Sequence, residues 1–181
     1  MRLLPVLALT WVACGASSGT MQQANTLYFW KVTSSDVVFG ACSDNANFRA
    51  GQKPIEFTDK TYFAYKVDST GKKATAQNCT ARDASACTAT TTVFDITGNQ
   101  LVTTSSSKAP IPGSTCSIAD LVTTTATDSG NTGTLELMHT YSLVDDQAAC
   151  DSIDNSLKTQ SPNGLGIQGC VITFKLGLTK G

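Results

Sequence analysis

The sequence predicts an all-β domain: an antiparallel meander that closes into a barrel or folds into a two-sheet sandwich, with one helix before the last strand. Three observations support this prediction. Apolar and polar residues alternate with a period of two in many segments that turn signals separate. Runs of threonine, whose β-branched side chain favours strands, supply polar positions. One late segment changes to helical spacing.

The first half of the domain is expected to form strands joined by turns. Residues 45–53 are expected to be a loop, and the Asp-Ser-Thr-Gly sequence at 68–71 is a turn signal. Alternation places Tyr28 and Trp30 on one face of their strand, and Phe63 and Tyr65 on one face of another, which predicts an inward aromatic set. The predicted strands cover residues 26–33, 37–39, 54–58, 61–67 and 74–80.

The second half is expected to continue the meander through residues 88–96, 101–104, 116–125 and 134–144. The Thr-Gly-Asn-Gln sequence at 97–100 predicts a tight hairpin, since Gly and Asn tolerate positive φ. Residues 105–115 are the longest irregular stretch, which is either a functional loop, as loops of that length often are, or a connection without a role. His139, the one histidine of the chain, shares a strand face with Tyr141.

The helix is expected at residues 145–159, where Ala149, Cys150, Ile153 and Leu157 follow helical spacing. Asp145 or Asp146 can cap its start. Residues 170–178 then alternate regularly and predict the closing strand. The predicted order is therefore a meander of about eight strands, one helix and a closing strand.

Residues 1–14 predict export. Arg2 precedes an apolar run at residues 3–12 and then small residues, which is the order of a secretory signal. The run is about half the roughly 20 residues that span a bilayer as a helix. The Val12-Ala13-Cys14 end resembles a bacterial lipobox, which implies a membrane anchor through a lipid on Cys14. The alternative is an ordinary signal peptide cut near residues 16–18, with Cys14 lost.

The predicted organisation is a signal peptide at 1–13, a flexible tether at 14–25 and one β domain at 26–181. The expected location is the outer membrane or cell surface as a lipoprotein in a bacterium, and otherwise the secreted fraction.

Six cysteines remain after Cys14, and an even set in an exported chain predicts disulfides. Zinc is disfavoured because the chain has no Cys-x-x-Cys spacing and one histidine. Six cysteines allow fifteen pairings. Proximity favours Cys79 with Cys87 and Cys150 with Cys170, which leaves Cys42 with Cys116.

Composition and motifs exclude several functions. Charged residues are 15% of the chain and the net charge is −1, so nucleic acid is not an expected partner. The Gly-x-Gly-x-x-Gly sequence at 164–169 lacks the preceding strand and following helix of a dinucleotide site. The aspartates around the helix lack EF-hand spacing. No metal or cofactor is expected.

The order of elements, with Trp30 near the start and a late helix followed by one strand, resembles the lipocalin layout. Tyr28 occupies the position of the family's glycine two residues before the tryptophan. The resemblance implies a barrel that carries a small apolar ligand, with candidate contacts from Tyr28, Trp30, Phe63, Tyr65, His139 and Tyr141.

Three functions follow as expectations. The first is a non-catalytic envelope protein that possesses such a ligand site, and the second is a structural or adhesive surface protein without one. The third is a hydrolase that uses His139, although no Gly-x-Ser-x-Gly sequence nominates a nucleophile. The oligomeric state is not indicated by the sequence.

Overall fold

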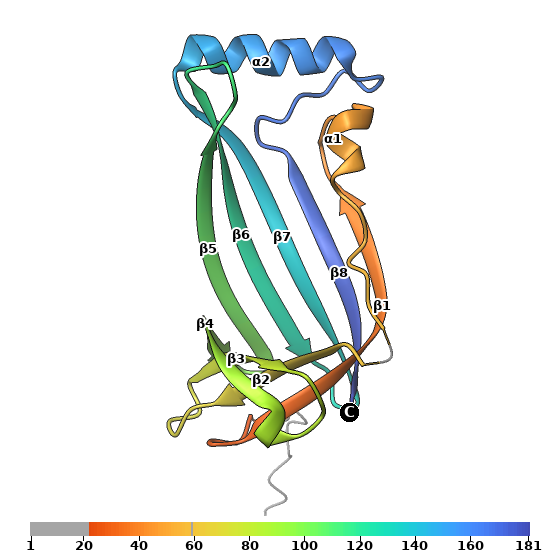
Figure 1. Cartoon of the computed structure of the whole chain (residues 1–181), viewed down its shortest axis with the longest axis vertical. Coiled ribbons are helices and arrows are strands. Elements are labelled where there is room, and N and C mark those ends of the chain that lie inside the picture. Colours follow the sequence, from red (N-terminus) through yellow and green to blue (C-terminus); the bar gives the residue numbers. More distant parts are fainter. Residues whose placement is uncertain (1–21, 59) are drawn as a thin grey trace, which may run out of the picture.

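A computed structural model describes residues 22–58 and 60–181 as a closed barrel of eight antiparallel strands in sequence order (Figure 1). This confirms the all-β prediction and selects the barrel over the sandwich. The helix α2 lies across one end of the barrel, before the final strand. The elements are β1 (Leu27–Phe39), α1 (Ala46–Ala50), β2 (Tyr62–Val67), β3 (Lys73–Cys79), η1 (Ala84–Ala86), β4 (Cys87–Thr97), β5 (Gln100–Pro110), β6 (Cys116–Asp128), β7 (Thr132–Asp145), α2 (Gln147–Gln160) and β8 (Val171–Lys180).

The strand β1 closes the barrel because it pairs with two neighbours. Its first part, from Leu27 to Lys31, pairs with β2, and its longer second part, up to Phe39, pairs with β8. A register shift between Val32 and Ser34 bends the strand between the two partners. The predicted strands at 26–33 and 37–39 are therefore one strand.

The strand β4 contains a large bulge that divides the barrel into two halves. Thr75 pairs with Val93, but Gln77 pairs with Ala89. Over this interval β4 advances by four residues while β3 advances by two. Because the bulge turns β4 away, it pairs with β5 only from Asp95 to Thr97. The closed half contains β2, β3 and this short seam. In the open half, β5 continues to Pro110 with β6 as its one strand neighbour among the described residues.

Each half has its own core. The closed half contains a dense cluster of apolar side chains around Trp30, Tyr65, Phe94, Leu101 and Leu135. The end of the open half, beneath α2, contains a second cluster that includes the buried side chains of Leu143, Cys150, Ile167 and Ile172. Between the two clusters lies the inner face of the long strands β5 to β8.

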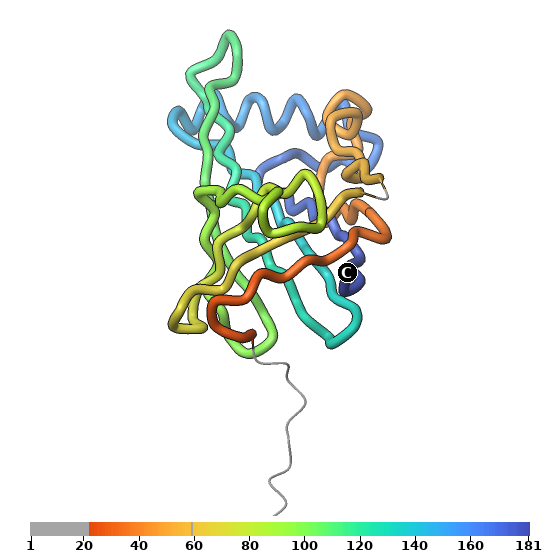
Figure 2. The backbone as a smooth tube through the Cα atoms, turned by 60° about the horizontal axis from the view of Figure 1, so that its bottom comes forward, coloured from red at the N-terminus to blue at the C-terminus, as the bar shows by residue number. Residues whose placement is uncertain are grey.

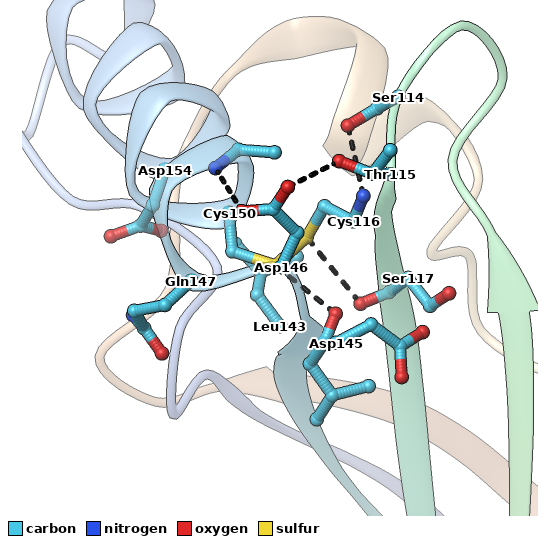
Figure 3. Close-up of a disulfide and its surroundings, with 12 residues drawn as sticks. Ser114, Thr115, Cys116, Ser117, Leu143, Asp145, Asp146, Gln147, Cys150 and Asp154 are labelled. Carbon is cyan, nitrogen blue, oxygen red and sulfur yellow. Dashed lines mark hydrogen bonds between the residues drawn. A yellow bond between two sulfur atoms is a disulfide. The ribbon is translucent and has the colours of Figure 1, made fainter.

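The helix α2 is fixed at its start by a cap and a disulfide (Figure 3). Asp146 caps the helix by accepting a hydrogen bond from the amide of Ala149 at 3.2 Å, and its other oxygen accepts one from Thr115 Oγ1 at 2.7 Å. Cys150 is bonded to Cys116 at the start of β6. The predicted helix and its cap are confirmed.

A buried carboxylate fixes the middle of α2 to the loop that leads into β8. Asp154 accepts hydrogen bonds from the amides of Ile167 and Gln168 at 2.8 and 3.0 Å, and its other oxygen pairs with Lys158 at 2.8 Å. Any Cβ at position 166 would overlap this carboxylate, so the site requires glycine. The glycines at 164–169 therefore serve the loop's backbone geometry, as their sequence context indicates.

The disulfides correct two of the three predicted pairs. Cys79–Cys87 is confirmed, but Cys42 pairs with Cys170 and Cys116 with Cys150. The predicted Cys150–Cys170 pair was wrong because α2 begins directly above β6, and its first turns therefore lie over Cys116 rather than over the start of β8. Cys42–Cys170 instead joins the chain that leaves β1 to the chain that enters β8.

Three local predictions were also wrong. Residues 54–58 form no regular element, and the predicted loop at 45–53 contains α1, which Asn45 caps. Residues 105–110 belong to β5, so the irregular stretch shrinks to a short tip at 111–115 that projects past α2 (Figure 2). The tip is therefore shorter than the irregular stretch that the sequence predicts at residues 105–115.

Candidate functional site

The predicted aromatic set lies in the closed half, where it forms the packed core. Trp30 and Tyr65 are 2% and 1% exposed, and the rings of Tyr28 and Tyr65 stack with centroids 5.2 Å apart. Phe63 meets Phe94 edge to face at 6.0 Å. The cavity lined by Trp30, Phe63 and Tyr65 has a volume of about 10 Å³. A space of that size holds at most one water molecule, so this cavity is too small for an apolar ligand.

A buried polar chain completes the closed half. The hydroxyl of Tyr65 donates to Gln22 Oε1 at 2.8 Å, and Gln22 Nε2 donates to the buried carboxylate of Asp128 at 3.2 Å. Burial, partly offset by a hydrogen bond with Trp30, raises the pKa of Tyr65 well above its usual range. The sequence does not predict these hydrogen bonds, because Gln22 lies outside every predicted strand.

The other two predicted site residues, His139 and Tyr141, lie in the open half on the inner face of β7. Their partners across β6 are Val122 and Asp120. Nδ1 of His139 lies 2.8 Å from Oδ2 of Asp120, and the second oxygen of Asp120 is buried with no hydrogen-bond partner among the described residues. Asp120 is not among the site residues predicted from the sequence, although the alternation of Ile118, Asp120 and Val122 places a carboxylate on the inward face of β6.

Aromatic rings surround this pair. Phe174 of β8 meets the His139 ring edge to face at 5.3 Å, and the Tyr141 ring lies parallel to it at 6.0 Å. The rings of Phe48 of α1 and Tyr141 meet edge to face, with their centroids 6.2 Å apart. Burial and then the charge of Asp120 raise the pKa of Tyr141, against an opposing hydrogen bond with Gln52. The segment around α1 therefore covers one side of the cluster.

The opposite side of the cluster is open toward β5. Ser105 and Ser107 stand opposite Val122 and Asp120 in the register, and both serines are exposed. The side chains of His139 and Asp120 keep about a fifth of their surface exposed, at 20% and 21%. We call this surface the open inner face and define it by Ser105, Ser107, Asp120, Val122, His139, Tyr141 and Phe174.

The open inner face combines one carboxylate, one imidazole and two aromatic rings. Such a surface can bind a partly apolar molecule through its rings and orient it through the polar pair. Asp120 is also the orienting acid that a hydrolase would need beside His139. No Ser, Thr or Cys side chain within residues 22–58 and 60–181 forms a hydrogen bond with His139.

Within residues 22–58 and 60–181, the His, Cys, Asp and Glu side chains form no group of three or more that could hold a metal ion. Neither α1 nor α2 has the length and apolar character needed to cross a membrane. The predicted signal peptide at 1–13, the predicted lipidation site Cys14 and most of the predicted tether lie outside the described residues.

Comparison with protein-family models, with curated proteins and with solved structures gave no match. The resemblance to lipocalins therefore remains one of architecture, a closed eight-stranded antiparallel meander with a late helix. The helix precedes the eighth barrel strand, whereas the sequence pattern predicts a closing strand after about eight others.

Proposed function

We propose that this protein is an exported, lipid-anchored and non-catalytic binding module of the cell envelope, and that its open inner face holds a small apolar ligand. The observation that carries the ligand site is the half-buried ring cluster of His139, Tyr141 and Phe174 around Asp120. The three disulfides indicate an oxidising, exported environment. We place the ligand site in the open half rather than at the aromatic residues of the closed half, because those residues leave a cavity of only about 10 Å³.

Binding of dodecanoate, followed by NMR shifts of the His139 and Tyr141 side chains, tests the ligand site. Tyr141→Ala removes a ring from the open inner face, and we expect it to weaken binding about tenfold or more. Met138→Ala is the matched control, because Met138 lies next to His139 on β7 but is 39% exposed on the outer face. Shifts confined to outer residues, equal losses in both variants, or no binding at millimolar dodecanoate would contradict the proposal.

The lipid anchor is tested by intact-mass measurement of the exported protein under non-reducing conditions. A lipid on Cys14 adds the mass of its acyl chains, and three disulfides remove six hydrogens. A mass that corresponds to an unmodified protein starting after residue 16 or 18 would instead indicate an ordinary cleaved signal peptide.

The Asp120–His139 pair favours the hydrolase as the second candidate. Hydrolysis of p-nitrophenyl acetate by the purified protein, lost in His139→Ala and kept in Met138→Ala, would replace the binding module with an enzyme. We expect no turnover above that of free imidazole.

A further inference from the structure

Among residues 22–58 and 60–181, the upper part of β5 has no strand partner on the side away from β6. Pairing with β4 ends at Val102, while pairing with β6 continues to Pro110. Figure 1 shows β5 rising above β4, with β6 along one side of its upper part and no strand along the other side. Every side chain from residue 104 to residue 110 is exposed. An edge of this length is a template on which another strand can add.

The register identifies which backbone groups are free. The two-residue hairpin makes Thr97–Gln100 a hydrogen-bonded pair, so even-numbered residues of β5 point their amides and carbonyls toward β4, and odd-numbered ones point theirs toward β6. The bond from the Ile111 amide to the Cys116 carbonyl at 3.0 Å agrees with this parity. Beyond Val102, the free groups therefore belong to Thr104, Ser106 and Lys108.

We propose that this edge pairs with the same edge of a second copy of the chain. In an antiparallel pair with its two-fold axis at Ser106, Ser106 meets its own copy and Thr104 meets Lys108 of the other copy. Each of these pairs can exchange two backbone hydrogen bonds. Other registers make fewer hydrogen bonds. With the axis at Ser105, Lys108 would stand opposite Val102, which is already paired with β4. With the axis at Ser107, Thr104 would stand opposite Pro110, which has no amide hydrogen.

Charge is compatible with this symmetric pairing. Lys108 is the one charged residue from Thr103 to Pro110, and its ammonium group pairs with Asp145 of its own chain at 3.0 Å. In the proposed register each Lys108 lies opposite a threonine, and the two lysines are four residues apart along the strands. That spacing is about 13 Å, beyond the screening length of about 8 Å in physiological salt. Lysine and proline normally protect strand edges, but here one is paired internally and the other stands at the end.

The inference does not depend on the ligand proposed above, because the side chains of Thr104, Ser106 and Lys108 point to the outer face. An edge contact of this size, without an apolar core, predicts a weak dimer with a dissociation constant in roughly the micromolar to millimolar range.

Sedimentation equilibrium of the oxidised protein from about 5 µM to 1 mM tests the pairing. We expect wild-type protein to shift from monomer to dimer, and Ser106→Pro to weaken association at least about tenfold, since it removes a central amide twice in the dimer. The Ser106 amide does not bond β6, so the barrel should keep its melting temperature. Ser106→Ala keeps the amide and should associate like wild type.

A second variant and amide exchange test the same pairing without introducing a proline. Ser106→Lys places two charges directly opposite each other and should also weaken association, whereas Thr140→Lys on the outer face of β7 should not. Amide exchange at Thr104, Ser106 and Lys108 should slow with rising concentration. A monomer throughout the range, association unchanged by both Ser106 variants, or protection of these amides already in the monomer would overturn the proposal.

Discussion

Nδ1 of His139 lies 2.8 Å from Oδ2 of Asp120, across neighbouring strands of the barrel wall. An ionised carboxylate only accepts hydrogen bonds, so a neutral His139 must carry its proton on Nδ1. Nε2 is then left as an acceptor, beside the rings of Tyr141 and Phe174. The pair thus fixes both the orientation and the tautomer of the imidazole.

The first prediction concerns this tautomer. Asp120→Asn replaces an acceptor with a group that can also donate, so the imidazole should lose its Nδ1–H preference and populate both tautomers. The measurement is the pair of ring ¹⁵N shifts of His139. Glu136→Gln is the control, because it removes a carboxylate that pairs with Lys175 rather than with His139. Ring shifts that match wild type in Asp120→Asn would show that the carboxylate does not set the tautomer.

The second prediction ranks the disulfides. Cys42–Cys170, Cys116–Cys150 and Cys79–Cys87 close loops of 128, 34 and 8 residues, for which chain entropy gives about 5, 4 and 2.5 kcal/mol of stability. Paired Cys→Ser variants should lose stability in that order in urea unfolding under oxidising conditions. Reductant should lower the wild-type melting temperature sharply. A wild-type melting temperature that reductant leaves unchanged would mean that the bridges do not form.

The third prediction concerns Gly166, whose added Cβ would overlap the Asp154 carboxylate. Gly166→Ala should destabilise the protein by about 2 to 4 kcal/mol, because the buried carboxylate or the loop must move. Gly51→Ala is the control, since Gly51 has ordinary helical φ and a nearest neighbour at 3.9 Å, and its effect should stay within about 0.5 kcal/mol. Equal urea midpoints for the two variants would show that the Asp154 contact carries no stability.

The fourth prediction is acid sensitivity. Burial raises the pKa of Asp154, but the hydrogen bond with Lys158 and the amides of Gln168 and Ile167 outweigh burial and hold the pKa below its usual value. A lowered folded-state pKa contributes stability above the unfolded value of about 4, and this stability is lost as pH falls through the folded value.

Asp154→Asn should therefore flatten the fall of unfolding free energy between about pH 5 and pH 2. Asp151→Asn, on the exposed side of the same helix, should leave the profile unchanged. Parallel profiles for wild type and Asp154→Asn would refute the assignment.

Local patterns predicted much of this fold, and long-range pairing explains the rest. Alternation located most strands, Gly98 marked a hairpin and Asp146 a cap, because each signal acts within a few residues. Ser105 to Ser107 have weak strand preference and are held extended by β6, which no local pattern reveals. Asp120 meets His139 only through the β6–β7 register. The threonines of β4 give no local sign of the bulge that opens one half of the barrel.

The polar chain through Gln22 has a consequence for how the molecule is oriented. Gln22 bonds to Asp128 at the end of β6, and the Lys180 amide bonds to Asn131 in the turn that follows, so both ends of the described chain lie at the closed half. Helix α2 lies at the far end of the barrel. A protein held at a membrane through residues before Gln22 would stand with its closed half toward the lipid, and would present α2 and the mouth of the open half to the surroundings.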